Sequence, residues 1–251
     1  KKFPAFSFTS IIEKKNKIYY SNPKSGWYRL DWGEWTAIWH TFTKNSKTKS
    51  THSHQDFGSV VLYHSGEEIL IDKGRYNYNK LKNSAGVLST LYNNHNTIEV
   101  DGIPISILPF KILPIEYQNI SYSMEFKKFE KYCCVTLIHN GFDRISKKNI
   151  NHKRKFYFFK DFFEVKDEII GNHKIDYSAN FNFLKDPDCK NSKFTFKSYK
   201  ENFRGTKNKL QILSNKDWYY PSYGRKTKSY NKQINFNGKL PFSIIHKISI
   251  T

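Results

Sequence analysis

The feature that most constrains this chain is a long series of short segments in which apolar and polar residues alternate, each bounded by Gly, Asn, Asp or Pro. Alternation with a period of two places successive side chains on opposite faces of a β-strand. Helical periodicity is scarce, and only residues 79 to 92 have room for a turn or two of helix. The chain is therefore predicted to be all-β, a large antiparallel β-sandwich (super-sandwich) with little helix.

The predicted strands cover most of the chain after residue 57. Gly58 to His64 and Glu67 to Asp72 flank Ser65-Gly66, which predicts a tight hairpin. The strand from Phe162 to Ile169 is expected to bury alternate residues, with Asp167 as the exception to burial on that face. The remaining predicted strands are His95 to Val100, Tyr117 to Phe126, Tyr132 to His139, Arg154 to Phe159, Tyr177 to Leu184, Phe194 to Tyr199, Lys209 to Leu213 and Phe242 to Ile250.

The length of 251 residues suits one large β domain, so we expect a single domain over residues 1–251, with residues 1–25 as a possible peripheral lead-in. Three cysteines, two of them adjacent, fit neither a disulfide framework nor a paired zinc spacing. No apolar run is long enough to cross a membrane, so no transmembrane segment is expected in this chain. The start at Lys1 without methionine suggests a fragment or a processed product.

The charge balance is strongly basic, with 42 Lys and Arg against 22 Asp and Glu, a net charge of +20. Such a chain attracts polyanions, but charge alone does not choose among nucleic acid, anionic lipid and acidic polysaccharide. A general Lys and Asn bias explains much of the excess equally well. Basic and aromatic residues lie together in Lys153 to Tyr157, as in a strand with one solvated basic face, and no nucleic-acid module is recognised. Nucleic acid is therefore not expected as a partner.

Two histidines and a carboxylate, His52, His54 and Asp56, fall within five residues just before a predicted strand. Asp72 ends the second strand of the predicted hairpin, and His95 opens a later strand. These groups could together form a metal and acid/base site. One histidine of this pair is expected to bind metal and the other to face a cleft.

Three ordered motifs resemble the heparinase II/III-like family of polysaccharide lyases. They are His52 to Tyr63, Gly66 to Tyr78 and His95 to Gly102, and a weaker likeness continues through residues 140–144, 152–156 and 165–171. The resemblance covers most of the chain. It implies the C-terminal β-sandwich of such an enzyme, which in the family follows an N-terminal α/α toroid. The active cleft lies between the two parts, and the toroid is missing here.

The resemblance also implies roles for individual residues. His54, Asp72 and His95 match the metal site of the family, usually zinc, and two imidazoles with a carboxylate suit that ion. His52 matches the catalytic histidine that lines the cleft. Arg75 offers a fork for a carboxylate or sulfate of the substrate, although an arginine that pairs across strands is an equal alternative. The histidines at 40, 64, 139, 173 and 246 are expected to be hydrogen-bonded structural residues, and that at 152 only slightly less so.

The function implied is the β-sandwich part of a lyase that cleaves uronic-acid-containing acidic polysaccharide by β-elimination, inactive without its toroid domain. Its partners would be the acidic polysaccharide and the N-terminal toroid of the same protein, and a degradative lyase would be periplasmic or secreted. The alternative is a non-catalytic domain that binds acidic polysaccharide or takes part in capsule or exopolysaccharide biosynthesis.

Overall fold

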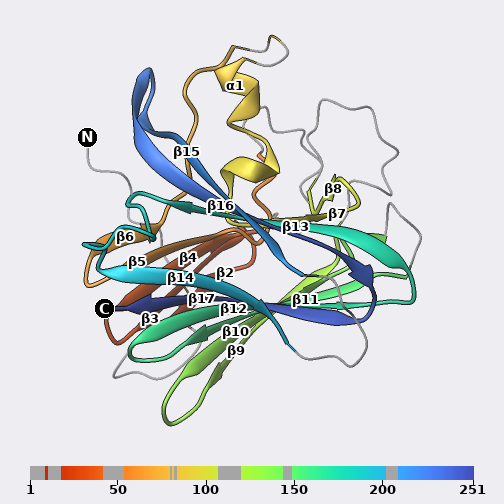
Figure 1. The fold of residues 1–251 in the computed structure, drawn as a ribbon. Helices are drawn as coiled ribbons and strands as arrows, with labels where there is room; N and C mark the ends of the chain where they lie inside the picture. Colours follow the sequence, from red (N-terminus) through yellow and green to blue (C-terminus); the bar gives the residue numbers. More distant parts are fainter. Residues whose placement is uncertain are drawn as a thin grey trace.

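The computed structural model describes residues 9–10, 18–41, 54–79, 81, 84–106, 120–143, 149–201 and 209–251. Two antiparallel sheets lie one above the other and form a sandwich (Figure 1). The predicted all-β sandwich is therefore confirmed. In the described part of the chain, no helix is long and apolar enough to cross a membrane.

The first sheet contains β1 (Thr9–Ser10), β2 (Tyr19–Asn22), β3 (Trp27–Trp32), β4 (Trp35–His40), β5 (Val60–His64), β6 (Glu67–Leu70), β7 (Ile98–Val100), β8 (Ile103–Pro104), β13 (Lys174–Phe183), β15 (Gln211–Ser222) and β16 (Arg225–Lys239). The second contains β9 (Tyr122–Lys128), β10 (Cys133–His139), β11 (Asn151–Phe158), β12 (Phe162–Ile170), β14 (Phe194–Lys200) and β17 (Phe242–Ile250). The short helices are α1 (Ala85–Leu88) and η1 (Tyr92–Asn94).

The larger sheet runs in the order β1-β2-β3-β4-β5-β6-β13-β16-β15, with β7 paired to β13 and β8 to β7. The smaller sheet runs β14-β17-β12-β11-β10-β9. The predicted hairpin is present as β5–β6, because Ser65 and Gly66 both take positive φ angles, 49° and 78°, as a two-residue turn of this hand requires. The predicted helical segment is present as α1 and η1.

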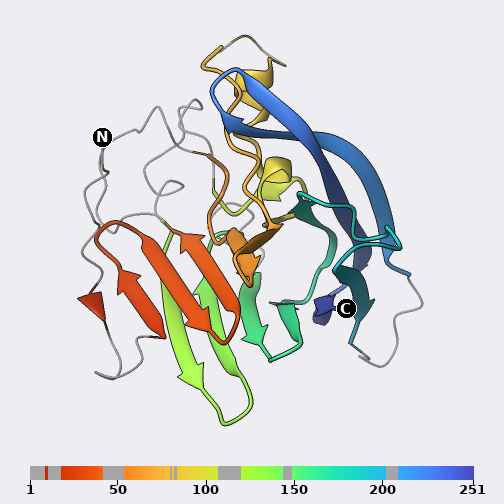
Figure 2. The same cartoon turned by 90° about the vertical axis from the view of Figure 1, so that its left-hand side faces the viewer.

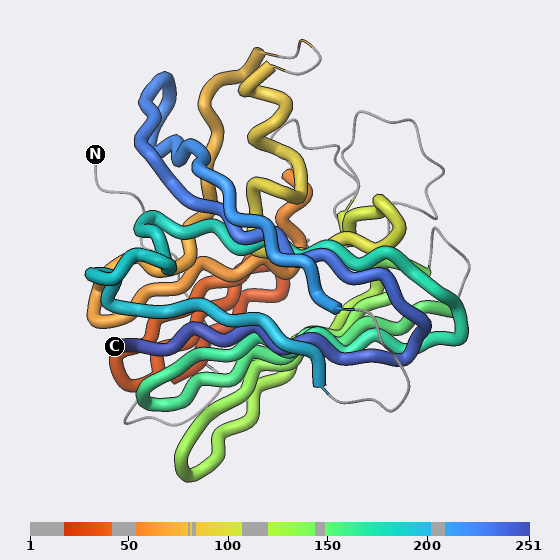
Figure 3. Tube along the Cα trace, in the orientation of Figure 1, coloured from red at the N-terminus to blue at the C-terminus, as the bar shows by residue number. Residues whose placement is uncertain are grey.

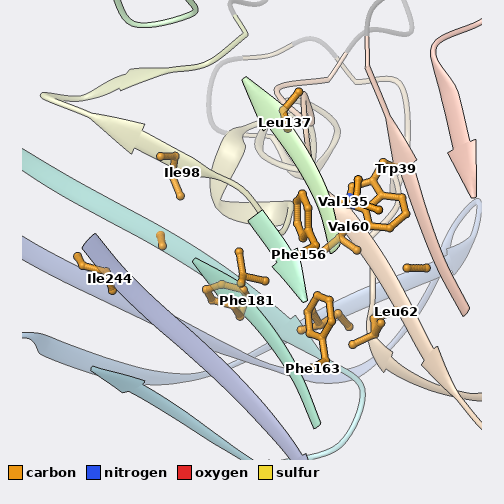
Figure 4. Close-up of a cluster of buried hydrophobic side chains, with 14 of the residues drawn as sticks. Trp39, Val60, Leu62, Ile98, Val135, Leu137, Phe156, Phe163, Phe181 and Ile244 are labelled. Atoms are coloured by element: carbon orange, nitrogen blue, oxygen red, sulfur yellow. The ribbon is translucent and has the colours of Figure 1, made fainter. Parts of the chain in front are cut away.

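The hydrophobic core fills the space between the two sheets (Figure 4). Trp39 and Phe181 come from the larger sheet, and Phe156 and Phe163 come from the smaller one. The rings of Trp39 and Phe156 meet edge to face, with centroids 5.2 Å apart. Burial of each such side chain stabilises the fold by about 1.5–3 kcal/mol. These aromatic side chains therefore hold the two sheets together.

Asp167 corrects one expectation about this core. Its side chain is fully buried on the same face of β12 as Phe163 and Val165, so the prediction that it escapes burial is wrong. Arg154, directly opposite on β11, is also fully buried and does not belong to a solvated basic face. A buried carboxylate is stable only when it is paired and hydrogen-bonded, and Asp167 has such partners in the core.

The long hairpin β15–β16 extends beyond the sheet and rises beside the segment that carries α1 (Figures 2 and 3). Near its tip, the Tyr220 N–H donates to the Lys73 carbonyl at 2.8 Å, and the Gly224 N–H donates to the Tyr76 carbonyl at 3.0 Å. Gly74 lies between these contacts with φ +69°, and a Cβ there would come within 2.5 Å of the Tyr220 carbonyl oxygen. The hairpin therefore fixes the loop that follows β6.

Candidate functional site

Three of the predicted site residues meet where the central strands β5 and β6 of the larger sheet begin and end, and we call His54, Asp72 and His95 the edge cluster. Asp72 follows β6, His95 follows η1, and His54 precedes β5. Asp72 Oδ2 lies 2.8 Å from His95 Nδ1, and the rings of His54 and His95 have centroids 5.2 Å apart. The other oxygen of Asp72 accepts the Gly74 N–H at 2.9 Å. Residues far apart in the sequence thus form one cluster.

Asp72 and His95 shift each other's pKa in the edge cluster. Burial alone would raise the pKa of Asp72, but the His95 imidazole and the Gly74 N–H hold it at about 2. Burial alone would lower the pKa of His95, but the Asp72 carboxylate raises it above its ordinary value. His95 is fully buried, and its Nε2 has no hydrogen-bond partner among the described residues. An unpaired buried nitrogen is costly and calls for a ligand.

His54 supplies the second imidazole of the edge cluster. It is half-buried, and burial together with the neighbouring His95 lowers its pKa. Its ring nitrogens have no hydrogen-bond partner among the described residues. Neutral imidazole nitrogens are preferred zinc donors, and a carboxylate behind a ligating histidine is a common way to orient the ring. The donor set therefore fits a zinc ion chemically, although no three His, Cys, Asp or Glu side chains of the described chain already converge as a metal site.

Asn96 joins the strands that carry the edge cluster, and the sequence analysis did not single it out. Its Nδ2 donates to the carbonyls of Val60, at 2.7 Å, and Ile71, at 3.0 Å. Its Oδ1 accepts the Asn182 N–H at 2.7 Å. The side chain is fully buried and stands next to His95 in sequence. It therefore positions His95 against the segment that ends at Asp72. An asparagine in an Asn-rich turn gives no sequence signal for this role.

Of the remaining two predicted site residues, only Arg75 is among the described residues. His52 lies outside the described residues, so its position in a cleft stays a prediction. The Nε of Arg75 donates to the Asn77 carbonyl at 3.2 Å, and its guanidinium carbon lies 4.4 Å from the centre of the Tyr78 ring. Arg75 follows Asp72 by three residues, and its positive charge contributes to the lowered pKa of His54.

A second group of histidines lies between the sheets, and we call His139, His152, Asp167, Tyr177 and His246 the core cluster. His139 Nε2 is 2.8 Å from His152 Nδ1, and His152 Nε2 is 2.9 Å from Asp167 Oδ1. The Tyr177 hydroxyl donates to Asp167 Oδ2 at 2.8 Å and is 2.9 Å from His246 Nε2. Two hydrogen-bonded chains therefore converge on one carboxylate.

The protonation of the first chain follows from a single backbone donor. The Gly141 N–H donates to His139 Nδ1 at 2.9 Å, so that nitrogen is an acceptor and the proton of His139 is on Nε2. His139 then donates to His152 Nδ1, and His152 donates from Nε2 to Asp167. Both imidazoles are consequently neutral, with fixed tautomers.

The second hydrogen-bonded chain runs from Ser198 through His246 and Tyr177 to Asp167, and it also fixes which nitrogen of its histidine carries the proton. Because the Tyr177 hydroxyl donates to Asp167, its oxygen accepts from His246 Nε2, and the Ser198 hydroxyl, 2.9 Å away, donates to His246 Nδ1. Burial lowers the pKa of His246. Burial alone would raise the pKa of Asp167, but Arg154, whose Nε is 3.3 Å from Oδ1, and the histidines hold it well below its usual value. The prediction that 139, 152 and 246 are hydrogen-bonded structural histidines is confirmed.

Comparisons with known proteins agree with this architecture. The family model "Heparinase II/III-like, C-terminal" matches residues 15–245. The structure of the heparan sulfate lyase HepC from Pedobacter heparinus superposes with a TM-score of 0.66 at 14% identity, over 95% of this chain and 37% of that one. A heparinase III superposes with a TM-score of 0.65 at 18% identity, over 91% of this chain and 36% of that one.

A putative mutarotase, YeaD from Salmonella typhimurium, superposes with a TM-score of 0.50 at 8% identity over 96% of each chain, and this likeness concerns the fold alone. No curated protein is similar enough in sequence to match. The chain spans little more than a third of the length of the two lyases. The match to the family model covers nearly the whole chain, and the chain therefore belongs to the family of heparinase II/III-like C-terminal domains.

Proposed function

We propose that this chain is the β-sandwich part of a polysaccharide lyase that cleaves uronic-acid-containing acidic polysaccharide by β-elimination. An N-terminal α/α toroid of the same protein would provide the other wall of the cleft. The observation that carries the proposal is the buried, unpaired Nε2 of His95, held in place by Asp72 and facing the same neighbourhood as His54. The structural histidines His139, His152 and His246, in contrast, have a partner at both nitrogens.

Charge supports the choice of substrate. The chain carries a net charge of +20, and a strongly positive protein draws polyanions to its surface. Arg75, beside the edge cluster, presents a planar guanidinium that matches a carboxylate or a sulfate. Both solved lyases that share the fold take their names from heparin or heparan sulfate.

β-Elimination removes the C5 proton of the uronate, breaks the bond between C4 and O4, forms a C4=C5 double bond and delivers a proton to O4. The reaction needs a base, an acid and cationic or donor groups that stabilise the charge on the uronate carboxylate. We assign His52 to the cleft as a proton-transferring or carboxylate-neutralising group, and Arg75 to the substrate carboxylate or sulfate. The acid that protonates O4 would come from the toroid.

We further propose that zinc binds at the edge cluster of His54, Asp72 and His95, with the two imidazoles as ligands and Asp72, bound to His95 Nδ1, as the group that orients the His95 ring. The ion, when bound, supplies a fixed positive charge at the wall of the cleft. His95 would direct its Nε2 to the metal, and Asn96 would hold the His95 segment against the segment of Asp72. Because these residues come from three separated segments, the metal would also hold those segments together in the folded protein.

Metal content tests the site directly. We expect the purified full-length protein to contain about one zinc ion per chain, and His54→Ala and Asp72→Ala each to lose it. His173→Ala is a matched control, because His173 is exposed in the turn between β12 and β13. Equal zinc content in the wild type and in both edge-cluster variants would refute the assignment.

Elimination is tested separately, by the ultraviolet absorbance of the new double bond when the full-length protein is incubated with a panel of uronate polysaccharides. We expect an increase with at least one polymer for the wild type and for His173→Ala, and none for His52→Ala. No increase with any uronate polymer, in protein that contains zinc, would reject the lyase and favour the non-catalytic alternative, a domain that binds acidic polysaccharide.

A further inference from the structure

A cavity of about 610 Å³ lies on the larger sheet, away from the interior of the sandwich. Its lining comes from β7, β13, β15 and β16, from Gly102 after β7 and from Lys209, two residues before β15. Binding sites for small molecules and sugar units typically enclose roughly 300–1,000 Å³. The cavity thus has the size of a ligand site, and no role proposed above uses it.

The strand register explains why this cavity is polar. Ser178 pairs with Glu99 on one side and with Asn235 on the other, and Asn235 pairs in turn with Gln211. Directly opposed residues project from the same face of a sheet, so these four side chains form one row across four strands. The residues that alternate with them, such as Ala179, point into the core. The row therefore faces outward into the cavity.

Several groups in this row have unused hydrogen-bonding capacity. The side chains of Asn235 and Gln211 make no hydrogen bond to any described residue, although Asn235 is half-buried. In the next row, Gln233 Nε2 donates to Ser178 Oγ at 3.1 Å, which holds the Gln233 carbonyl oxygen at the cavity wall. Amides carry both donors and acceptors, and sugar hydroxyl and acetamido groups require both.

The charge of the cavity is opposite in sign to that of the whole chain. Among the lining residues that the structure describes, Glu99 and Asp176 face one cation, Lys209, whereas the chain has a net charge of +20. The Tyr92 hydroxyl donates to Glu99 Oε1 at 2.6 Å, and Asn237 Nδ2 donates to Asp176 Oδ1 at 2.5 Å, so both carboxylates are fixed in place. A sulfate or carboxylate would be repelled here, while an uncharged sugar would be accepted.

A polar path connects this cavity with the edge cluster. Asn182 and Asn231 pair on the same outer face, and Asn231 Nδ2 donates to Asn182 Oδ1 at 2.9 Å. The Asn182 N–H in turn donates to Asn96, the residue that positions His95. From the candidate zinc site to the cavity, the outer face of β13 and β16 is thus lined by amide side chains.

We propose that the cavity binds an uncharged hexose or N-acetylhexosamine unit, as a subsite distinct from the cationic region that receives uronate. That this unit belongs to an acidic polysaccharide rests on the proposed function. The binding itself depends only on the amide row and on the local negative charge.

The experiment is a titration of the full-length protein with three probes, an N-acetylglucosamine trisaccharide, cellotriose and trigalacturonate. Binding of each probe is measured by calorimetry or by changes in amide chemical shifts. Asn235→Leu is nearly isosteric but cannot hydrogen-bond, and we expect it to weaken binding of the neutral trisaccharides about tenfold, which corresponds to one or two lost hydrogen bonds. Asn215→Leu is the matched control, because Asn215 lies on the same face of the same hairpin but does not line the cavity.

Binding of a neutral trisaccharide that is weakened in Asn235→Leu and unchanged in Asn215→Leu would support the inference. Absence of binding by both neutral probes, or equal binding by the two leucine variants, would overturn it, as would preferential binding of trigalacturonate that depends on Asn235. Neutral-sugar binding needs neither zinc nor elimination, so it should survive His54→Ala. A protein that binds the neutral probes but eliminates no uronate would overturn the proposed function alone.

Discussion

In the core cluster every imidazole nitrogen has a partner, whereas in the edge cluster only one nitrogen of His95 does. The three histidines of the core donate and accept along two chains that end at Asp167. At the edge, Asp72 orients His95 from one side and leaves its buried Nε2 unpaired. The same side chains thus fasten a fold in one place and remain available to a ligand in the other.

The two clusters also differ in what neutralises their carboxylates. Asp167 is fully buried, and Arg154, fully buried opposite it, provides the permanent charge. The side chain of Asp72 is 35% exposed and is paired with an imidazole. Arg154 also donates from Nη1 to the Asn96 carbonyl at 3.2 Å, so the two clusters are physically joined. The core should therefore control stability, and the edge should control ligand binding.

Removal of the core cation is the strongest way to test this division. Arg154→Met keeps the length and the apolar contacts of the side chain but leaves Asp167 as a buried carboxylate without its cation. We expect a loss of about 3–5 kcal/mol in the free energy of unfolding, measured by urea denaturation. The double variant Arg154→Met/Asp167→Asn removes both charges and should recover part of this loss. A loss below about 1 kcal/mol in the single variant would show that Arg154 does not sustain the core.

Acid should have the next largest effect, and it should act on the core cluster. His246 faces Tyr177, Asp167 and Arg154, and its pKa is lowered in the folded protein. A lowered folded pKa means that the unfolded chain binds the proton more readily. Its contribution to stability is therefore complete above about pH 6.5 and is lost as the pH falls from there toward the folded pKa. Asp167, whose folded pKa is also lowered, adds a loss only at pH values below its ordinary range near 4.

The size of the acid effect follows from linkage. We expect the stability of the wild type, relative to His246→Gln, to fall by up to about 1.4 kcal/mol per pH unit below pH 6.5. Glutamine can donate to Tyr177 and accept from Ser198 without titrating, so the comparison isolates this one group. Denaturation curves at pH 8, 7, 6 and 5 would check it. Parallel pH profiles for the two proteins would contradict the neutral imidazole at position 246.

The alternation of the sequence was sufficient to predict the sandwich, because apolar side chains at every second position dictate which face is buried. It did not predict β2, β3 and β4, although these strands bury alternate residues, nor did it predict β16 and the long extension of β15, whose residues toward the hairpin tip are mostly exposed and polar. Strands without a buried face carry no alternating signal. The burial of Asp167 was not predicted either, because it depends on hydrogen-bond and charge partners in other strands.

The edge cluster was predicted as a set because His54, Asp72 and His95 stand in ordered motifs. Asn96 and the amide row on β13 and β16 were not, because their roles arise from strand pairing between distant segments. The sequence shows only asparagines and glutamines in strands, where β-propensity disfavours asparagine. The pairing of Ser178 with Asn235, and of Asn235 with Gln211, is visible only in the folded sheet.

The smallest expected effect concerns His54 in metal-free protein. It tests whether the edge cluster contributes less to stability than the core cluster does. His54→Ala should change the free energy of unfolding by about 1 kcal/mol or less, because the half-buried ring has no hydrogen-bond partner in the described chain. His152→Ala, which removes the imidazole that links His139 Nε2 to Asp167 Oδ1, should cost about 3 kcal/mol. Zinc at a hundredfold excess over its dissociation constant should then stabilise the wild type by about 2.7 kcal/mol and His152→Ala equally, but not His54→Ala. Equal stabilisation of all three proteins would mean that zinc binds elsewhere, and the unpaired nitrogen of His95 would need another ligand.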